Sequence, residues 1–217
     1  MSTTTHHLSD ETLQDYAAGS LDAPMETLVA CHLTMCPRCR ERAAFADSVG
    51  GALLEGNERA PVGASAADVL ARAEGGPAPA PSAPDPPPVG GVPRPLARLL
   101  PSGLDELLWR RVAPGIRQFN LAARHRRHGA FKLLHLAPGT ALSGHGHNDR
   151  ELTYVVRGSY TDEIGRFRAG DIADLDANDE HCPVVDPGEP CIALIATQSP
   201  VRFHGIVGRI MQPFVGI

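Results

Sequence analysis

The sequence predicts two domains: a small all-α bundle of about four helices, followed by an all-β barrel of two antiparallel sheets. Three observations lead to this fold class. Residues 1–75 contain short stretches with the apolar spacing of amphipathic helices. Residues 96–217 contain short apolar or alternating runs separated by Gly, Pro, Asp or Asn, which is typical of strands. Between the two regions, nine of the 20 prolines fall between Pro77 and Pro95.

The proline-rich segment sets the predicted domain boundaries. Proline fixes φ and has no amide donor, so this segment can form neither a helix nor a central strand. We expect an extended, semi-rigid linker at 76–95, between a helical domain at 1–75 and a barrel at 96–217. A chain of 217 residues is long enough for two modest domains.

Composition indicates the cellular compartment of the protein. No run approaches the roughly 18 apolar residues that a membrane-spanning helix needs, and the N-terminus has no basic-then-apolar leader. The five cysteines are an odd number, and Cys36 and Cys39 are only three residues apart. This usage favours metal ligation in a reducing compartment over a disulfide framework. We therefore expect a cytoplasmic protein.

Charge is distributed unevenly along the chain. The net charge is −5, and residues 1–75 carry five Arg against eleven Asp and Glu, which leaves the remainder close to neutral. An acidic module is a poor direct ligand for nucleic acid, but it suits a basic protein, including one that itself binds nucleic acid. An ordinary solvated acidic surface explains the charge equally well.

Four helices are expected in residues 1–75, each beginning at a capping residue or at a proline. Their expected starts are Ser9, Asp22 with Pro24, Pro37 and Ser65. The second helix should present one apolar face, formed by Met25, Leu28, Val29, His32 and Leu33. Because helices this short are marginal in water by themselves, something must hold them together.

A metal ion is the candidate for that role. The pattern His32-x3-Cys36-x2-Cys39 straddles the predicted turn between the second and third helices, so one tetrahedral ion could join them. The fourth ligand would come from His6 or His7, just before the first helix. Cys31 is the local competitor, but it points about 100° away from its neighbour on the helix.

Strands are expected from Pro114 onward, with a second metal site among them. The predicted strands are 131–136, 152–156, 171–175 and 191–196. On a strand, His145 and His147 point to the same side, Glu151 can add a carboxylate, and His181 can add a third imidazole. This set suits zinc, iron, copper or nickel rather than calcium or magnesium, and the sequence does not choose among the first four.

The spacing of these residues resembles a known motif. Gly139-x5-His145-x-His147-x3-Glu151-x6-Gly158 resembles the first motif of the cupins, which implies a double-stranded β-helix, or jelly roll. In the second motif, Gly170 and His181 fall at the expected interval. Asp176 and Asn178, however, stand where the family usually has Pro and Gly, and Val185 stands in place of Asn.

The whole chain resembles the ChrR-type anti-sigma factors, in which a zinc-binding anti-sigma domain precedes a cupin. The resemblance implies zinc held by His7, His32, Cys36 and Cys39, and a second zinc held by His145, His147, Glu151 and His181. It also implies a one-to-one complex with an extracytoplasmic-function sigma factor, released in response to singlet oxygen or organic hydroperoxides. No direct binding to nucleic acid or membrane is expected.

An enzyme is the alternative hypothesis. Three histidines and one glutamate around iron also serve in cupin dioxygenases, and the helical module would then be an accessory zinc domain. The sequence offers no convincing acid–base pair beyond the metal ligands, so we expect a regulator without catalytic turnover.

Overall fold

The computed structural model describes residues 4–58, 63–75, 91–121, 129–146, 149–198 and 202–203, with the backbone alone at 145–146 and 202–203. Helices come first along the chain and strands second, as predicted. The helices are α1 (Asp10–Ala17), α2 (Ala23–Met35), α3 (Pro37–Glu55), α4 (Ala66–Glu74) and α5 (Arg94–Ala97), and a 3-10 turn spans Leu104–Glu106. The strands are β1 (Arg110–Ala113), β2 (Ile116–Asn120), β3 (Phe131–Leu136), β4 (His145–Gly146), β5 (Glu151–Arg157), β6 (Ser159–Thr161), β7 (Arg166–Arg168), β8 (Ile172–Leu175), β9 (Glu180–His181), β10 (Val184–Val185), β11 (Cys191–Thr197) and β12 (Arg202–Phe203).

The first four helices begin where their capping residues predict. The side chains of Ser9, Asp22 and Ser65 each accept a hydrogen bond from a backbone amide in the first turn of the helix that follows. Ser65 and Asp68 form a reciprocal capping box. Most of the predicted linker, residues 76–90, lies outside the described residues. Helix α5 begins at Arg94, inside the range predicted for the linker.

The strands form a six-stranded sheet and two three-stranded sheets, all antiparallel. The six-stranded sheet has the order β1-β2-β3-β11-β5-β8, and the smaller sheets have the orders β10-β6-β7 and β12-β4-β9. The four predicted strands are confirmed as β3, β5, β8 and β11, each within one residue at either end. The first strand begins at Arg110, before the predicted start at Pro114. It escapes prediction because its two arginines are exposed and give no apolar signal.

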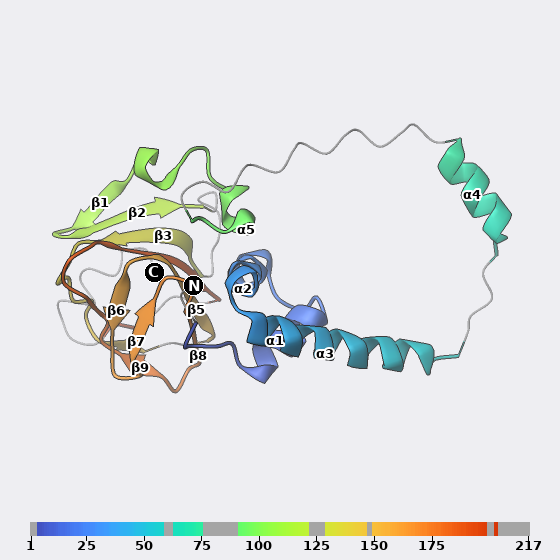
Figure 1. Cartoon of the computed structure of the whole chain (residues 1–217), viewed down its shortest axis with the longest axis horizontal. Coiled ribbons are helices and arrows are strands. Elements are labelled where there is room, and N and C mark those ends of the chain that lie inside the picture. Colours follow the sequence, from blue (N-terminus) through green and yellow to red (C-terminus); the bar gives the residue numbers. More distant parts are fainter. Residues whose placement is uncertain are drawn as a thin grey trace.

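The six-stranded sheet is covered on both faces. One face packs on the small sheet β10-β6-β7 and forms the barrel core, in which Leu134 and Val155 meet Tyr160 and Phe167. The opposite face of β5 and β11 packs on the helices, chiefly on α2 (Figure 1). Burial on both faces explains why β11 reads as an almost unbroken apolar run rather than an alternating one.

Figure 1 shows α1, α2 and α3 side by side against the barrel, with α3 reaching away from it and α4 set apart. No residue of α4 is buried. Arg150, at the start of the barrel strand β5, bridges to α1 through ion pairs with Asp15 (2.7 Å) and Glu11 (2.8 Å). Part of the acidic charge of the helical module is therefore matched by the barrel. Within the described ranges, no helix has the length and apolar character needed to cross a bilayer.

Candidate functional site

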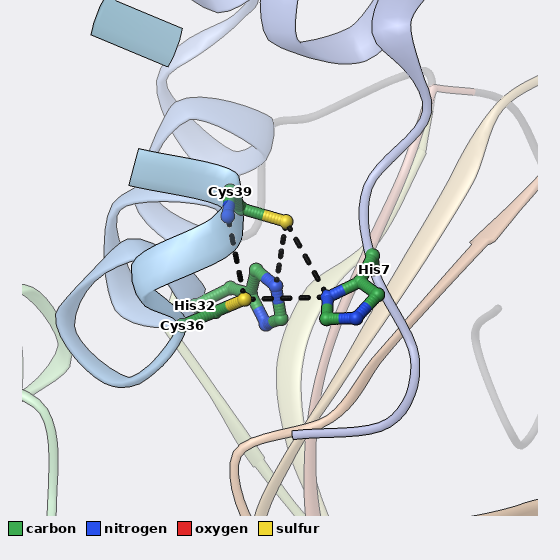
Figure 2. A group of neighbouring side chains, drawn as sticks. All are labelled: His7, His32, Cys36 and Cys39. Atoms are coloured by element: carbon green, nitrogen blue, oxygen red, sulfur yellow. Dashed lines mark hydrogen bonds between the residues drawn. The ribbon is translucent and has the colours of Figure 1, made fainter. Parts of the chain in front are cut away.

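Two imidazoles and two thiols meet where α2 ends and α3 begins (Figure 2). Nδ1 of His7 lies 3.2 Å from Sγ of Cys36 and 3.7 Å from Sγ of Cys39. Nε2 of His32 lies 3.3 Å from Sγ of Cys39. One donor atom from each of the four residues lies within 4.8 Å of the others, so the group could hold a metal ion. Two thiols and two imidazoles are a donor set that suits tetrahedral zinc.

A single helix junction positions three of these donors. Cys36 is at once the C-cap of α2 and the N-cap of α3, and its backbone is extended. Pro37 then starts α3, and the amide of Cys39 donates to Sγ of Cys36 over 3.4 Å, so both thiols face the same side. The amide of Cys36 donates to the carbonyl of His32, which places that imidazole one helical turn away.

His7, rather than His6, completes the group. The two residues are neighbours in the segment before α1, and their side chains take different directions. His6 turns away from the cluster and stacks on Phe167, with the ring centroids 3.8 Å apart. Cys31 also lies outside the group. It is fully buried, and burial raises the pKa of its thiol to about 12.

Burial changes the pKa of two side chains in the cluster, His32 and Cys39. It lowers the pKa of His32 to about 4, so this ring is neutral at pH 7, the form that binds a metal. Nδ1–H of His32 donates to the carbonyl of Gly170 over 2.9 Å, which leaves Nε2 facing the thiols. Burial also raises the pKa of the Cys39 thiol to about 11. A metal ion must therefore displace a proton from this thiol when it binds.

The barrel brings together part of the second predicted ligand set. His145 in β4 pairs with His181 in β9 across an antiparallel ladder. Glu151 and His181 are buried and line one cavity. His147 and the side chain of His145 lie outside the described residues. The structure thus places two of the four predicted side chains in a common cavity.

The barrel cavity is small. Its volume is about 30 Å³, and Thr153 and Tyr160 line it together with the two predicted ligands. A cavity of this size has room for an ion or for about two water molecules, whereas pockets for organic ligands measure roughly 300–1,000 Å³. The cavity therefore fits a metal centre better than the substrate pocket of a dioxygenase.

Two further side chains in the barrel fit a metal centre. Nδ1 of His181 lies 3.0 Å from Oδ2 of Asp162, and both side chains are buried. Although burial opposes it, hydrogen bonds from His181 and from the amides of Gly165 and Ile164 hold the pKa of Asp162 below its ordinary value. A carboxylate in this position fixes the ring so that Nε2 can act as a ligand. The buried hydroxyl of Tyr160 has no hydrogen-bond partner among the described residues, as expected beside a site for water or an ion.

A groove on the helical module forms a second concave surface. It measures about 890 Å³ and lies between α1 and α3. Its wall carries Phe45, Val49 and Leu53, which are spaced four residues apart on α3 and are largely exposed, and Glu41 and Asp47 contribute acidic charge. Apolar side chains exposed together in a groove indicate a surface for a partner.

Sequence reasoning missed Asp162, Tyr160 and the groove. Asp162 precedes Gly165 in a tight connection between two strands, so its sequence context indicates only a turn. Tyr160 lies in an ordinary short strand. The groove did leave a signal, because Phe45, Val49 and Leu53 form an i, i+4, i+8 stripe within the predicted third helix.

Comparison with known proteins gives three findings. A family model described as the ChrR cupin-like domain matches residues 102–200. The anti-sigma-E factor ChrR of Cereibacter sphaeroides is 41% identical over 218 residues, which cover 98% of each chain. The crystal structure of Rhodobacter sphaeroides SigE in complex with the anti-sigma factor ChrR matches with a TM-score of 0.73 and 36% identity. That match covers 90% of this chain and 100% of the other.

Proposed function

Because the chain belongs to the ChrR family of anti-sigma factors, we propose that it binds one extracytoplasmic-function sigma factor and keeps it from RNA polymerase. The whole-length match carries this proposal, since it spans both the helical module and the barrel. Family membership also confirms that the chain is a regulator and not an enzyme. The proposal places the protein in the cytoplasm, where a sigma factor acts.

The groove between α1 and α3 supplies the binding surface in this proposal. Phe45 and Leu53 are 71% and 69% exposed, which is costly for large apolar side chains unless a partner covers them. The acidic side chains of Glu41 and Asp47 at the groove would attract a basic partner and speed its association. Val69 and Leu70 of α4 are also exposed and would extend the contact.

We propose that the two modules have separate roles. Residues 1–75 bind the sigma factor, residues 76–95 link the modules, and residues 96–217 sense the environment. Zinc bound by His7, His32, Cys36 and Cys39 would hold α2, α3 and the segment before α1 in one arrangement, and so shape the groove. The convergence of these four donor atoms supports the ligand set.

The barrel would hold the second metal ion, through His145, His147, Glu151 and His181. The shared cavity of Glu151 and His181 supports this site, as does the carboxylate of Asp162 behind His181.

Release of the sigma factor requires that oxidation favour the free state over the bound state. We propose singlet oxygen or an organic hydroperoxide as the signal, acting at the barrel. Cys182 is exposed and adjacent to His181, so it is open to oxidation. Cys191 is buried, and burial raises the pKa of its thiol to about 12, so it should react slowly.

Affinity capture from native lysate tests the proposal. The full-length chain should retain one sigma factor in a one-to-one complex, identified by mass spectrometry, and the purified pair should block transcription from promoters that need that sigma factor. Capture without any sigma factor, or a complex that leaves transcription unchanged, would refute the proposal.

A further inference from the structure

The barrel reaches the metal cluster of the helical module through one short stretch, residues 166–172, which we call the β7–β8 segment. The carbonyl of Gly170 in this segment accepts the hydrogen bond from Nδ1 of His32, 138 residues away along the chain. Gly170 has φ +98°, and a Cβ at this position would lie 3.2 Å from Cγ2 of Thr4. Glycine therefore permits both the turn and the close approach of the N-terminal segment.

Asp171, the next residue, holds the segment that carries His7. Its side chain is 2% exposed, and its carboxylate accepts hydrogen bonds from the amides of Thr5 (2.6 Å) and His6 (3.1 Å) and from the hydroxyl of Thr5 (3.2 Å). A further bond comes from the amide of Arg168 within the barrel. The stacking of His6 on Phe167 adds a second anchor, so the backbone is fixed on the barrel immediately before His7.

The four donors of the cluster are thus positioned from two different sources. The thiols of Cys36 and Cys39 are set by the junction of α2 and α3. The imidazole of His32 owes its tautomer to Gly170, and the place of His7 depends on Asp171. Without the barrel, the helices would present two fixed thiols, one imidazole free to rotate and a His7 held only from its C-terminal side, where Arg42 of α3 donates to the carbonyl of Leu8.

We propose that Gly170 and Asp171 of the barrel are positioning residues for the metal centre of the helical module, so that its metal affinity depends on the docked barrel. The inference rests on the ligand set proposed above and does not depend on sigma-factor binding. Groups that orient metal ligands in this way typically change metal affinity about 10- to 100-fold. By linkage, a metal ion in the cluster strengthens barrel docking by the same factor.

The β7–β8 segment also contacts a residue that lines the barrel cavity. Phe167 stacks on His6 on one side and on Tyr160, with the centroids 4.9 Å apart, on the other. Tyr160 lines the cavity that contains Glu151 and His181. The rings of His6, Phe167 and Tyr160 therefore form a continuous stack between the wall of the barrel cavity and the residue before His7. A rearrangement at the cavity can act on the helical metal centre through these packed side chains.

Cobalt binding to the full-length chain, without sigma factor, tests the inference. Among the proposed ligands only Cys36 and Cys39 carry thiols, so the thiolate-to-cobalt absorption band reports the helical site alone. The test variants are Asp171→Ala and Asp171→Leu, neither of which offers an acceptor to the amides of Thr5 and His6. The matched control is Asp174→Ala, because Asp174 accepts hydrogen bonds from the amide and hydroxyl of Ser9 across the same interface, over 2.9 and 2.8 Å.

We expect Asp171→Ala to bind cobalt about 10- to 100-fold more weakly than wild type, and Asp174→Ala to stay within about threefold. Equal losses in these two variants would overturn the inference, because the effect would then belong to the interface in general. Should Asp171→Ala fail to fold, Asp171→Leu decides, because leucine fills a similar space without an acceptor. A weaker thiolate band with shifted d–d bands supports positioning, and an unchanged spectrum and affinity refute it. A wild-type chain that shows no thiolate band refutes the ligand set itself.

Discussion

Replacing Phe45 by alanine should weaken sigma-factor binding without weakening the fold. The ring is 71% exposed on the wall of the groove, so the free protein gains little from it. A phenylalanine buries roughly 150–250 Å² when fully covered, which leaves on the order of 100–180 Å² for a partner to cover. At about 25 cal/mol per Å² this area corresponds to roughly 3–4 kcal/mol. After the costs of association we expect a net loss of about 2 kcal/mol, or roughly 30-fold in Kd.

The assay is a titration of the purified sigma factor into full-length wild-type and Phe45→Ala chains, with a thermal melt of each. Leu108→Ala is the control, because Leu108 is 90% exposed but lies outside the groove. The melting temperatures should stay nearly equal, since exposed substitutions change stability by about 0.5 kcal/mol or less. If Phe45→Ala and Leu108→Ala bind equally well, the groove is not the binding surface.

Three further predictions concern the metal centres and the core. Elemental analysis of Cys39→Ser should find one zinc ion fewer per chain. This variant should also unfold at a lower temperature, because the metal ion holds the short helices together. His181→Ala should also lose one metal ion, yet keep its affinity for the sigma factor, because its cavity lies inside the barrel. Burial lowers the pKa of Lys132 from its ordinary value to about 8, so above pH 8 the unfolded chain holds this proton while the folded chain releases it, and the destabilising contribution of Lys132 fades between about pH 8 and pH 10. Lys132→Met should be more stable than wild type at pH 7 by up to about 3 kcal/mol, measured by urea unfolding, and this difference should shrink as the pH rises to about 10.

Each of these predictions has a contrary result. Full zinc content in Cys39→Ser would exclude that thiol as a ligand. Loss of sigma-factor binding in His181→Ala would show that the barrel contributes to binding the sigma factor rather than acting as a sensor. A stability difference between Lys132→Met and wild type that stays constant between pH 8 and 10 would show that Lys132 does not titrate there.

The features that could be predicted from the sequence depend on residues that lie close together in the chain. Ser9, Asp22 and Ser65 cap helices through contacts within three residues, and the spacing of His32, Cys36 and Cys39 encodes a shared face of one helix junction. These features depend on neighbours in the chain, so a pattern in the sequence carries them. The fold class and three of the four donors of the helical cluster, His32, Cys36 and Cys39, could be predicted on this basis.

Contacts between the modules could not be predicted, because they depend on which face of the sheet the helices cover. The bond from His32 to Gly170 spans 138 residues and has no local signature. The choice between His6 and His7 depends on how Asp171 holds the amides before them, which sets the direction of each side chain. The almost unbroken apolar run of β11 was the one available hint that a second layer covers the barrel.

In the proposed function, a metal ion shapes the helical module into the surface that binds a sigma factor. Titration of the purified sigma factor into the full-length chain, first with zinc bound and then after its removal by a chelator, tests this claim most directly. We predict a tight one-to-one complex with zinc and affinity at least about tenfold weaker without it, restored when zinc is returned. Equal affinity in the two states would contradict the account.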